Sequence, residues 1–93
     1  MKTYLITYDL RAPGRNYQSL YIAIEAIGNR CHPLESTWIV ASAETAARIR
    51  DRLSRHIDRN DRLLITRLSA EAAWFGLSDP TGQWLQQQLA SAA

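Results

Sequence analysis

Cysteine is almost absent from this sequence, because Cys31 is the only one among 93 residues. A single thiol excludes an intramolecular disulfide and a zinc site built from several cysteines. Long apolar runs are missing too: no stretch approaches the ~18 residues that span a membrane, and no signal-peptide core follows Met1. We therefore expect a cytoplasmic protein that does not associate with a membrane. Walker loops, dinucleotide fingerprints and zinc motifs are also absent.

Lysine is as scarce as cysteine. Lys2 is the only one, so the other ten of the 11 basic residues are arginines, and the formal net charge is +2. This mild basicity favours an anionic partner, and a guanidinium group fits phosphate with two parallel hydrogen bonds. The alternative is that the arginines only reflect a GC-rich genome.

The first half of the chain predicts a strand, a helix and two more strands. Residues 3–10 are rich in β-branched and aromatic side chains, which is typical of a strand. Asn16 is the expected cap of a helix that ends with Gly28 at its C′ position. Residues 31–41 hold two strands, the first on a sheet edge because Pro33 cannot donate to a central ladder. The apolar stripe of the helix consists of Tyr17, Leu20, Tyr21, Ile24 and Ile27.

The second half predicts another helix and strand. Ser42 is the expected cap of a helix over residues 43–57, and residues 62–68 predict a strand. The helix buries Ala46, Ile49, Leu53 and Ile57.

The resulting order is that of a ferredoxin-like βαββαβ sandwich, an α+β fold. We expect one domain over residues 1–93, with a core at 3–68 and a C-terminal extension at 70–93. The extension predicts a short strand at 72–77 and a helix with Pro80 in its first position. Both core helices cover one sheet face, so a partner, the tail or a ligand must cover the other.

Asp9 is the first candidate for chemistry, because it closes an apolar strand where a loop begins. Such a carboxylate binds Mg²⁺ through one oxygen, and two copies across a dimer axis make a better site than one. The alternative is an ordinary strand-end acid paired with Arg11. Arg11, Arg15 and Arg30 are candidates for surrounding the same sheet end and holding phosphates.

Four arginines share one stripe of the second predicted helix, because their spacings are four, three and four residues. Arg48, Arg52, Arg55 and Arg59 form this stripe. It predicts a surface that follows a nucleic-acid backbone. The alternative is a solvated face tied by Glu44–Arg48 and Asp51–Arg55 pairs.

Tyr4 and Tyr8 share one face of the first strand with Ile6. Aromatic side chains on an open sheet stack on bases, or they form core or a dimer interface. A pocket beneath them would instead suit a small-molecule sensor. His32 and His56 lie too far apart in sequence to suggest a metal pair.

The motifs resemble those of the CRISPR-associated Cas-two family. Residues 4–11, Tyr-Leu-Ile-Thr-Tyr-Asp-Leu-Arg, resemble its Tyr-Asp-Ile/Leu start, and Ser36-Thr37-Trp38 stands where that family has Ser-Val-Phe. Residues 61–65 match its acidic turn and following strand. The sequence is closer still to the Cas-two-like proteins labelled the SinR family, through its Pro-Leu-Glu-Ser-Thr-Trp and Asn-Asp-Arg-Leu segments. The resemblance covers about residues 3–77.

The resemblance implies a ferredoxin-like homodimer in which two sheets face each other, with metal-dependent phosphodiesterase activity in some members. It implies catalytic positions at Asp9, Tyr8, Arg11 and Ser36, with one Mg²⁺ shared between two copies of Asp9. Nucleic-acid contacts are expected from Arg15, Arg30, Arg48, Arg52, Arg55 and Arg59.

Besides the small-molecule sensor, three functional hypotheses remain open from the sequence. The leading one is a Cas-two-like homodimer that binds RNA or DNA and is a candidate endonuclease. The second is a non-catalytic binding or assembly module, in which Asp9 is structural. The third is a toxin of the VapD type, which shares a related fold.

Overall fold

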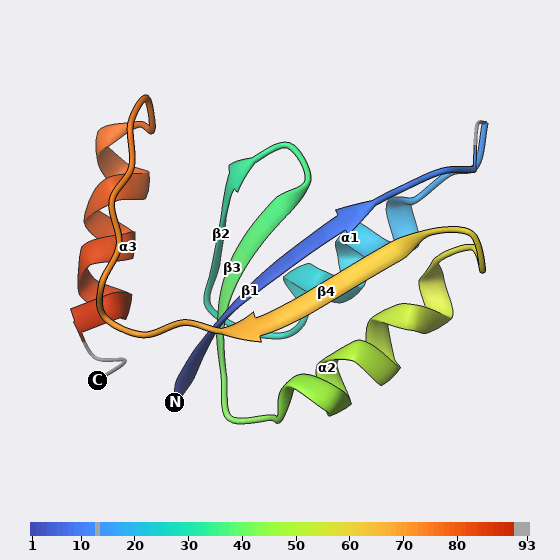
Figure 1. The fold of residues 1–93 in the computed structure, drawn as a ribbon, viewed down its shortest axis with the longest axis horizontal. Helices are drawn as coiled ribbons and strands as arrows, with labels where there is room; N and C mark the ends of the chain where they lie inside the picture. The colour runs from blue at the N-terminus through green and yellow to red at the C-terminus, as the bar shows by residue number, and fades with distance from the viewer. Residues whose placement is uncertain (13, 91–93) are drawn as a thin grey trace.

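The protein is a small α+β domain built on one antiparallel sheet. The computed structural model describes residues 1–12 and 14–90 (Figure 1). Four strands pair in the order β2-β3-β1-β4, so that β1 and β3 are central. The bounds are Lys2–Asp9 for β1, Arg30–Leu34 for β2, Thr37–Ser42 for β3 and Arg62–Arg67 for β4. The edge position of β2 agrees with the expectation drawn from Pro33.

Two helices cover one face of this sheet. Helix α1 spans Gln18–Glu25, and α2 spans Ala46–Leu53 and continues as a 3₁₀ helix over Ser54–His56. The core forms between these helices and β1 and β3. Its fully buried side chains are Ile6, Leu20, Ile24, Val40, Ile49 and Leu53, which include two residues of each predicted helix stripe. The stripe residues Tyr21, Ile27, Ala46 and Ile57 are only partly buried against this core.

The second sheet face lies opposite α1 and α2. Successive side chains of a strand point to opposite faces, so Tyr4, Ile6 and Tyr8 face the helices, where all three are buried in the core. Leu5, Thr7 and Asp9 therefore belong to the second face. The tyrosines are core residues, which is why they form neither a base-stacking surface nor the floor of an open small-molecule pocket.

Helix α2 begins later than predicted. Thr45, not Ser42, is its N-cap, because the Thr45 side chain accepts a hydrogen bond from the Arg48 backbone N–H at 3.2 Å. The Ser42 hydroxyl instead accepts from the Glu44 backbone N–H at 3.1 Å. Residues 43–45 are thus a fixed connection between β3 and α2 rather than the first turn of the helix.

Gly28 has a different role from the one predicted. Helix α1 ends at Glu25 and its C-cap is Ala26, so Gly28 lies beyond the C′ position. A Cβ atom at Gly28 would come within 2.8 Å of the Ala41 carbonyl oxygen. Glycine is needed there because this connection to β2 passes close to the backbone of β3.

The C-terminal extension covers part of the second face. Helix α3 spans Asp79–Ala90 and runs alongside β2 (Figure 1), with Leu85 and Leu89 buried. Ser78 precedes it and accepts a hydrogen bond from the Gly82 backbone N–H at 2.9 Å, so Pro80 is the second helical residue and not the first. The predicted strand at 72–77 is not formed, and the end of the predicted tail, 91–93, lies outside the described residues.

Candidate nucleic-acid interface

Asp9 lies at the exposed end of β1 on the second sheet face. Its Oδ2 atom accepts from Arg11 Nε at 2.8 Å and lies 2.7 Å from Arg11 Nη2. On the neighbouring strand, its pairing partner is Arg62. A shallow hollow of about 230 Å³ is lined by Thr7, Tyr8, Asp9, Arg62, Leu63 and Leu64. The strand-end acid paired with Arg11, foreseen as the alternative, is therefore present.

One copy of this hollow does not fit Mg²⁺. The ion prefers six oxygen ligands, whereas Asp9 is the only carboxylate lining the hollow, and one of its oxygens is held by Arg11. Among residues 1–12 and 14–90, no three His, Cys, Asp or Glu side chains come together as a metal site. A shared metal would require the Asp9 of a second copy.

Tyr8 points away from Asp9, because consecutive strand residues face opposite sides of the sheet. Its hydroxyl accepts from Trp38 Nε1 at 3.1 Å and donates to the Glu35 carbonyl at 3.4 Å. Burial raises the pKa of Tyr8 above its ordinary value. Tyr8 and Trp38 thus stabilise the core beneath the β2–β3 turn, and the Tyr8 side chain is separated from Asp9 by the sheet.

Ser36 lies at the same end of the sheet as Asp9. Its carbonyl accepts from the Tyr8 backbone N–H and from the Thr7 hydroxyl, both at 3.1 Å. The turn that carries Ser36 is therefore tied to the end of β1. All four predicted catalytic positions therefore lie at this end, but the side chain of Tyr8 is on the other sheet face.

Arg30 does not belong to that sheet end, contrary to expectation. It pairs with Val40 on β3, and Val40 pairs with Tyr4, near the start of β1. Its guanidinium makes an ion pair with Glu25 at 3.6 Å. The expectation was wrong because the start of β2 lies at the end of the sheet opposite to Asp9.

Arg15 lies in the loop after β1, and its position depends on Asp61, which sequence reasoning treated only as part of a polar turn. Arg15 Cζ is 5.6 Å from the centre of the Tyr17 ring. The Tyr17 hydroxyl donates to Asp61 Oδ2 at 2.7 Å, and the Arg11 backbone N–H donates to Asp61 Oδ1 at 2.5 Å. Asp61 therefore ties Arg11 and Tyr17 to the turn before β4.

Hydrogen bonds also lower the pKa of Asp61. Desolvation alone would raise its pKa, but the hydrogen bonds from Arg11, Tyr17 and Asp58 outweigh it and leave the pKa below its ordinary value. Burial, followed by the bond to Asp61, raises the pKa of Tyr17. The signal in the sequence was the motif Asp58-Arg59-Asn60-Asp61, in which a carboxylate can accept from the backbone three residues earlier, as Asp61 does from Asp58 at 2.7 Å.

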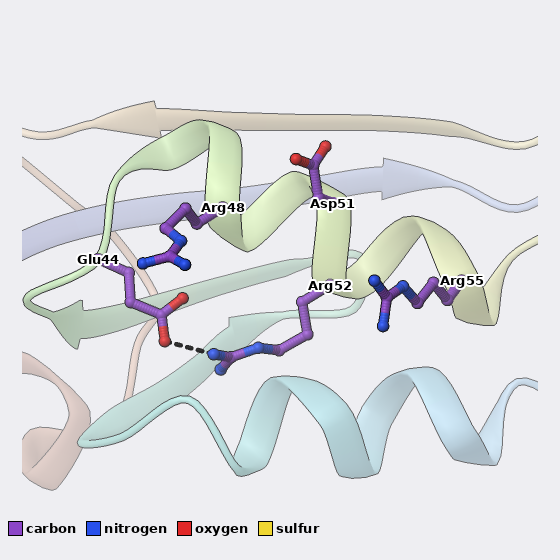
Figure 2. A pocket seen from close by; sticks show the side chains of 5 residues that line it. All are labelled: Glu44, Arg48, Asp51, Arg52 and Arg55. Atoms are coloured by element: carbon purple, nitrogen blue, oxygen red, sulfur yellow. Dashed lines mark hydrogen bonds and ion pairs between the residues drawn. The ribbon is translucent and has the colours of Figure 1, made fainter.

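Three of the predicted nucleic-acid contacts come together on α2 and on the 3₁₀ helix that continues it. Arg48, Arg52 and Arg55 line a groove of about 440 Å³ together with Glu44 and Asp51, which we call the arginine groove. Figure 2 shows the three arginine side chains extending from the side of α2 that faces α1. The spacing of four and three residues places them on one helix face, as predicted.

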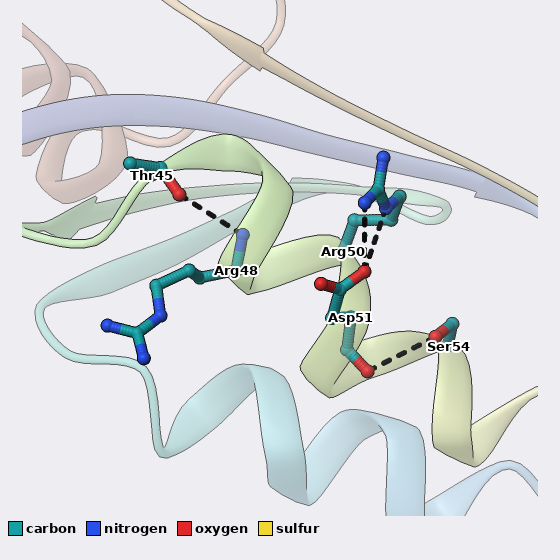
Figure 3. A network of polar contacts seen from close by, with 5 residues as sticks. All are labelled: Thr45, Arg48, Arg50, Asp51 and Ser54. Carbon is teal, nitrogen blue, oxygen red and sulfur yellow. Dashed lines mark hydrogen bonds and ion pairs between the residues drawn. The ribbon is translucent and has the colours of Figure 1, made fainter.

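The acidic residues of the groove pair differently from the expected Glu44–Arg48 and Asp51–Arg55 pairs. Glu44 Oε1 accepts from Arg52 Nη2, and Asp51 pairs with its neighbour Arg50 at 2.9 Å (Figure 3). Within the part of the chain that the structure describes, the Arg48 and Arg55 guanidinium groups have no ion-pair partner. Two cationic side chains therefore remain available for an external anion.

Arg59 lies outside the groove. The α-helix ends at Leu53, and after the 3₁₀ helix the chain enters the turn that contains Arg59. The predicted stripe therefore ends at Arg55, because the helical periodicity on which it depended does not continue. The arginine groove belongs to the helix layer, whereas Asp9 is on the second sheet face, so the structure separates the two predicted parts of the site.

No protein-family model and no solved structure matches the chain. The likeness to Cas-two proteins thus stays a prediction from short motifs. None of the described helices has the length and apolar character needed to cross a membrane.

Proposed function

We propose that this protein binds the phosphate backbone of nucleic acid through the arginine groove. The observation that carries this proposal is that, among the described residues, the guanidinium groups of Arg48 and Arg55 have no ion-pair partner, and both line the groove beside Arg52. Arginine binds phosphate oxygens with two parallel hydrogen bonds, and its charge persists at every physiological pH.

The composition of the groove favours contact with the backbone rather than with bases. Proteins that hold single strands stack bases on aromatic side chains, but no aromatic residue lines the groove. Phosphate contacts alone carry no sequence information. The expected ligand is therefore a duplex, bound without sequence preference.

The fold we propose is ferredoxin-like, and the family is Cas-two-like. Support comes from the chain order β1-α1-β2-β3-α2-β4 together with the sheet order β2-β3-β1-β4, with both core helices on one face. The end of β1 also carries the Tyr-Asp-Leu sequence of that resemblance.

We further propose a homodimer formed through the second sheet face. Apolar side chains are exposed there and beside it: Phe75 is 99% exposed, Leu34 60% and Leu64 57%. Leu34 and Phe75 border an apolar cavity of about 330 Å³ between this face, the segment 72–77 and α3. Apolar surface of this kind is typical of an interaction site.

Comparing the wild-type protein with a variant that lacks the Arg48 and Arg55 charges tests the proposed function. The readout is the affinity for a fluorescently labelled duplex of mixed sequence. A variant that binds as tightly as the wild type would exclude the arginine groove as the binding surface.

Metal-dependent cleavage of the bound nucleic acid is the second candidate function. The observation that favours it is the exposed position of Asp9 on the face proposed for the dimer, where two copies would meet. The alternative within the same proposal is a non-catalytic binding or assembly module, which agrees with the Asp9–Arg11 pair.

The Asp9→Asn variant distinguishes metal-dependent cleavage from a non-catalytic binding module. If the Asp9 pair holds Mg²⁺, the substitution abolishes cleavage of RNA or DNA by the protein supplied with Mg²⁺, since a neutral amide is a poor ligand for the ion. Unfolding by heat should be nearly unchanged, because an exposed ion pair such as Asp9–Arg11 contributes roughly 0–1 kcal/mol. Wild-type protein that leaves every substrate intact, with Mg²⁺ or Mn²⁺ present, would eliminate the enzymatic candidate and leave the binding module.

A further inference from the structure

Glu44 occupies the end of the arginine groove. Its carboxylate pairs with Arg52, and Figure 2 shows it lying between the side chains of Arg48 and Arg52. Asp51, the other acidic residue of the groove, is directed away from Arg52 and Arg55 in the same view and pairs with Arg50. Glu44 is therefore the one acid among the lining residues that engages a groove arginine.

The backbone of Glu44 is held on both sides. The Tyr4 hydroxyl donates to the Glu44 carbonyl at 2.7 Å, and the Glu44 N–H donates to Ser42 Oγ at 3.1 Å. Tyr4 is buried in the core, and Thr45, the next residue, caps α2. These contacts fix the point from which the side chain extends, so its negative charge stays near the groove whether or not a ligand is bound.

Carboxylates and phosphates bind guanidinium groups in the same two-pronged way. The Glu44 carboxylate therefore stands where a backbone phosphate would contact Arg52. A phosphate entering that position must displace the carboxylate and then remain beside its charge, because the backbone of Glu44 cannot move away.

We propose that Glu44 is an internal competitor that blocks the Arg52 phosphate position and limits the affinity of the groove for nucleic acid. This inference rests on the proposed function and adds a specificity-determining residue to it. With Arg52 occupied, Arg48 and Arg55 make the phosphate contacts of the wild-type protein. A ligand needs several adjoining phosphates to bind, which selects polymeric nucleic acid over single phosphate groups.

Glu44→Gln tests the competition. Removing the charge frees Arg52 for a third phosphate, so we expect about 3- to 10-fold tighter binding of the labelled duplex at 50 mM salt. Each added phosphate contact steepens the dependence of log affinity on log salt by about 0.9. The gain should therefore shrink by about fourfold between 50 and 200 mM salt.

Glu71→Gln is the matched control, because it makes the same change in net charge in the exposed segment after β4 and outside the groove. It should bind within about twofold of the wild type. Equal affinities of the two glutamine variants would overturn the inference, and weaker binding by Glu44→Gln would show instead that Glu44 positions Arg52 for the ligand.

Arg52→Gln supplies an independent check that does not rely on one variant. The check is made in the Glu44→Gln background, where Arg52→Gln should remove the whole gain in affinity, because the freed Arg52 guanidinium makes the added phosphate contact. A Glu44→Gln gain that persists without Arg52 contradicts the competition. The proposed function fails separately, if removing the Arg48 and Arg55 charges leaves binding intact.

Discussion

Replacing Arg48 and Arg55 together by glutamine is expected to weaken duplex binding about 10- to 100-fold at low salt. Both guanidinium groups lie in the arginine groove and have no ion-pair partner among the described residues. Each hydrogen-bonded contact with a charged group is worth about 1.5–3 kcal/mol, and solvent exposure of the groove reduces this. Stability should change little, because neither side chain is buried. Fluorescence anisotropy with a labelled duplex measures the change.

A double variant outside the groove controls for net charge. Arg59→Gln combined with Arg67→Gln removes the same two charges from exposed positions that line neither the groove nor the Asp9 hollow. If long-range attraction between the protein's net charge and the duplex dominates, both double variants lose the same affinity. A localised site requires the Arg48/Arg55 double variant to lose at least about fivefold more affinity, and equal losses would contradict it.

Replacing Phe75 by aspartate is expected to convert a homodimer into monomers. Phe75 is 99% exposed in one chain and borders the apolar cavity beside α3. Aromatic side chains buried at the centre of an interface contribute about 2 kcal/mol or more, and a charge placed there adds desolvation cost. The dissociation constant should therefore rise at least about 30-fold. Light scattering at micromolar concentration gives the mass of each species.

Ile22→Asp is the control for the effect of Phe75→Asp on the proposed dimer. Ile22 is also an exposed apolar side chain, 55% exposed, but it lies on α1 in the helix layer. It should leave the dimer intact. Wild-type protein with the mass of a monomer at these concentrations would refute the dimer, and loss of the dimer in the Ile22 variant would move the interface to the helix layer.

Most strands and helices were predictable because their local signals agree with the tertiary contacts. Pro33 marks an edge strand, whereas the burial of the face that Tyr4, Ile6 and Tyr8 share depends on the helices packed against it. Ser42 was a false cap signal, because two residues with hydroxyl groups lie close together and Thr45 is the one that accepts from the helix. The role of Gly28 depends on the Ala41 carbonyl, a contact between distant segments that no local pattern reveals.

The candidate site was predictable only where it lies on one element. Helical spacing brought Arg48, Arg52 and Arg55 together correctly, and it failed at Arg59 because the helix ends first. The pairing of Glu44 with Arg52 spans eight residues and depends on the fixed connection before α2, so the usual spacing of four residues predicted the wrong partner.

Interactions between elements account for the remaining differences. Asp61 joins the turn before β4 to the loop after β1, which a search for neighbouring charges does not detect. Arg30 was assigned to the wrong sheet end because its position depends on how β2 pairs with β3 and β3 with β1, which the sequence does not reveal. Tyr8 was grouped with Asp9 by sequence adjacency, although adjacent strand residues face opposite sides.

The salt dependence of duplex binding by the wild-type protein tests the central claim most directly. Two phosphate contacts per groove, from Arg48 and Arg55, predict a slope of log affinity against log salt of about −2 for each groove engaged. Two duplexes of unrelated sequence should give the same affinity and slope, because the groove contacts only the backbone. Absence of binding at 50 mM salt, or binding that is insensitive to salt, would contradict a phosphate-binding arginine groove.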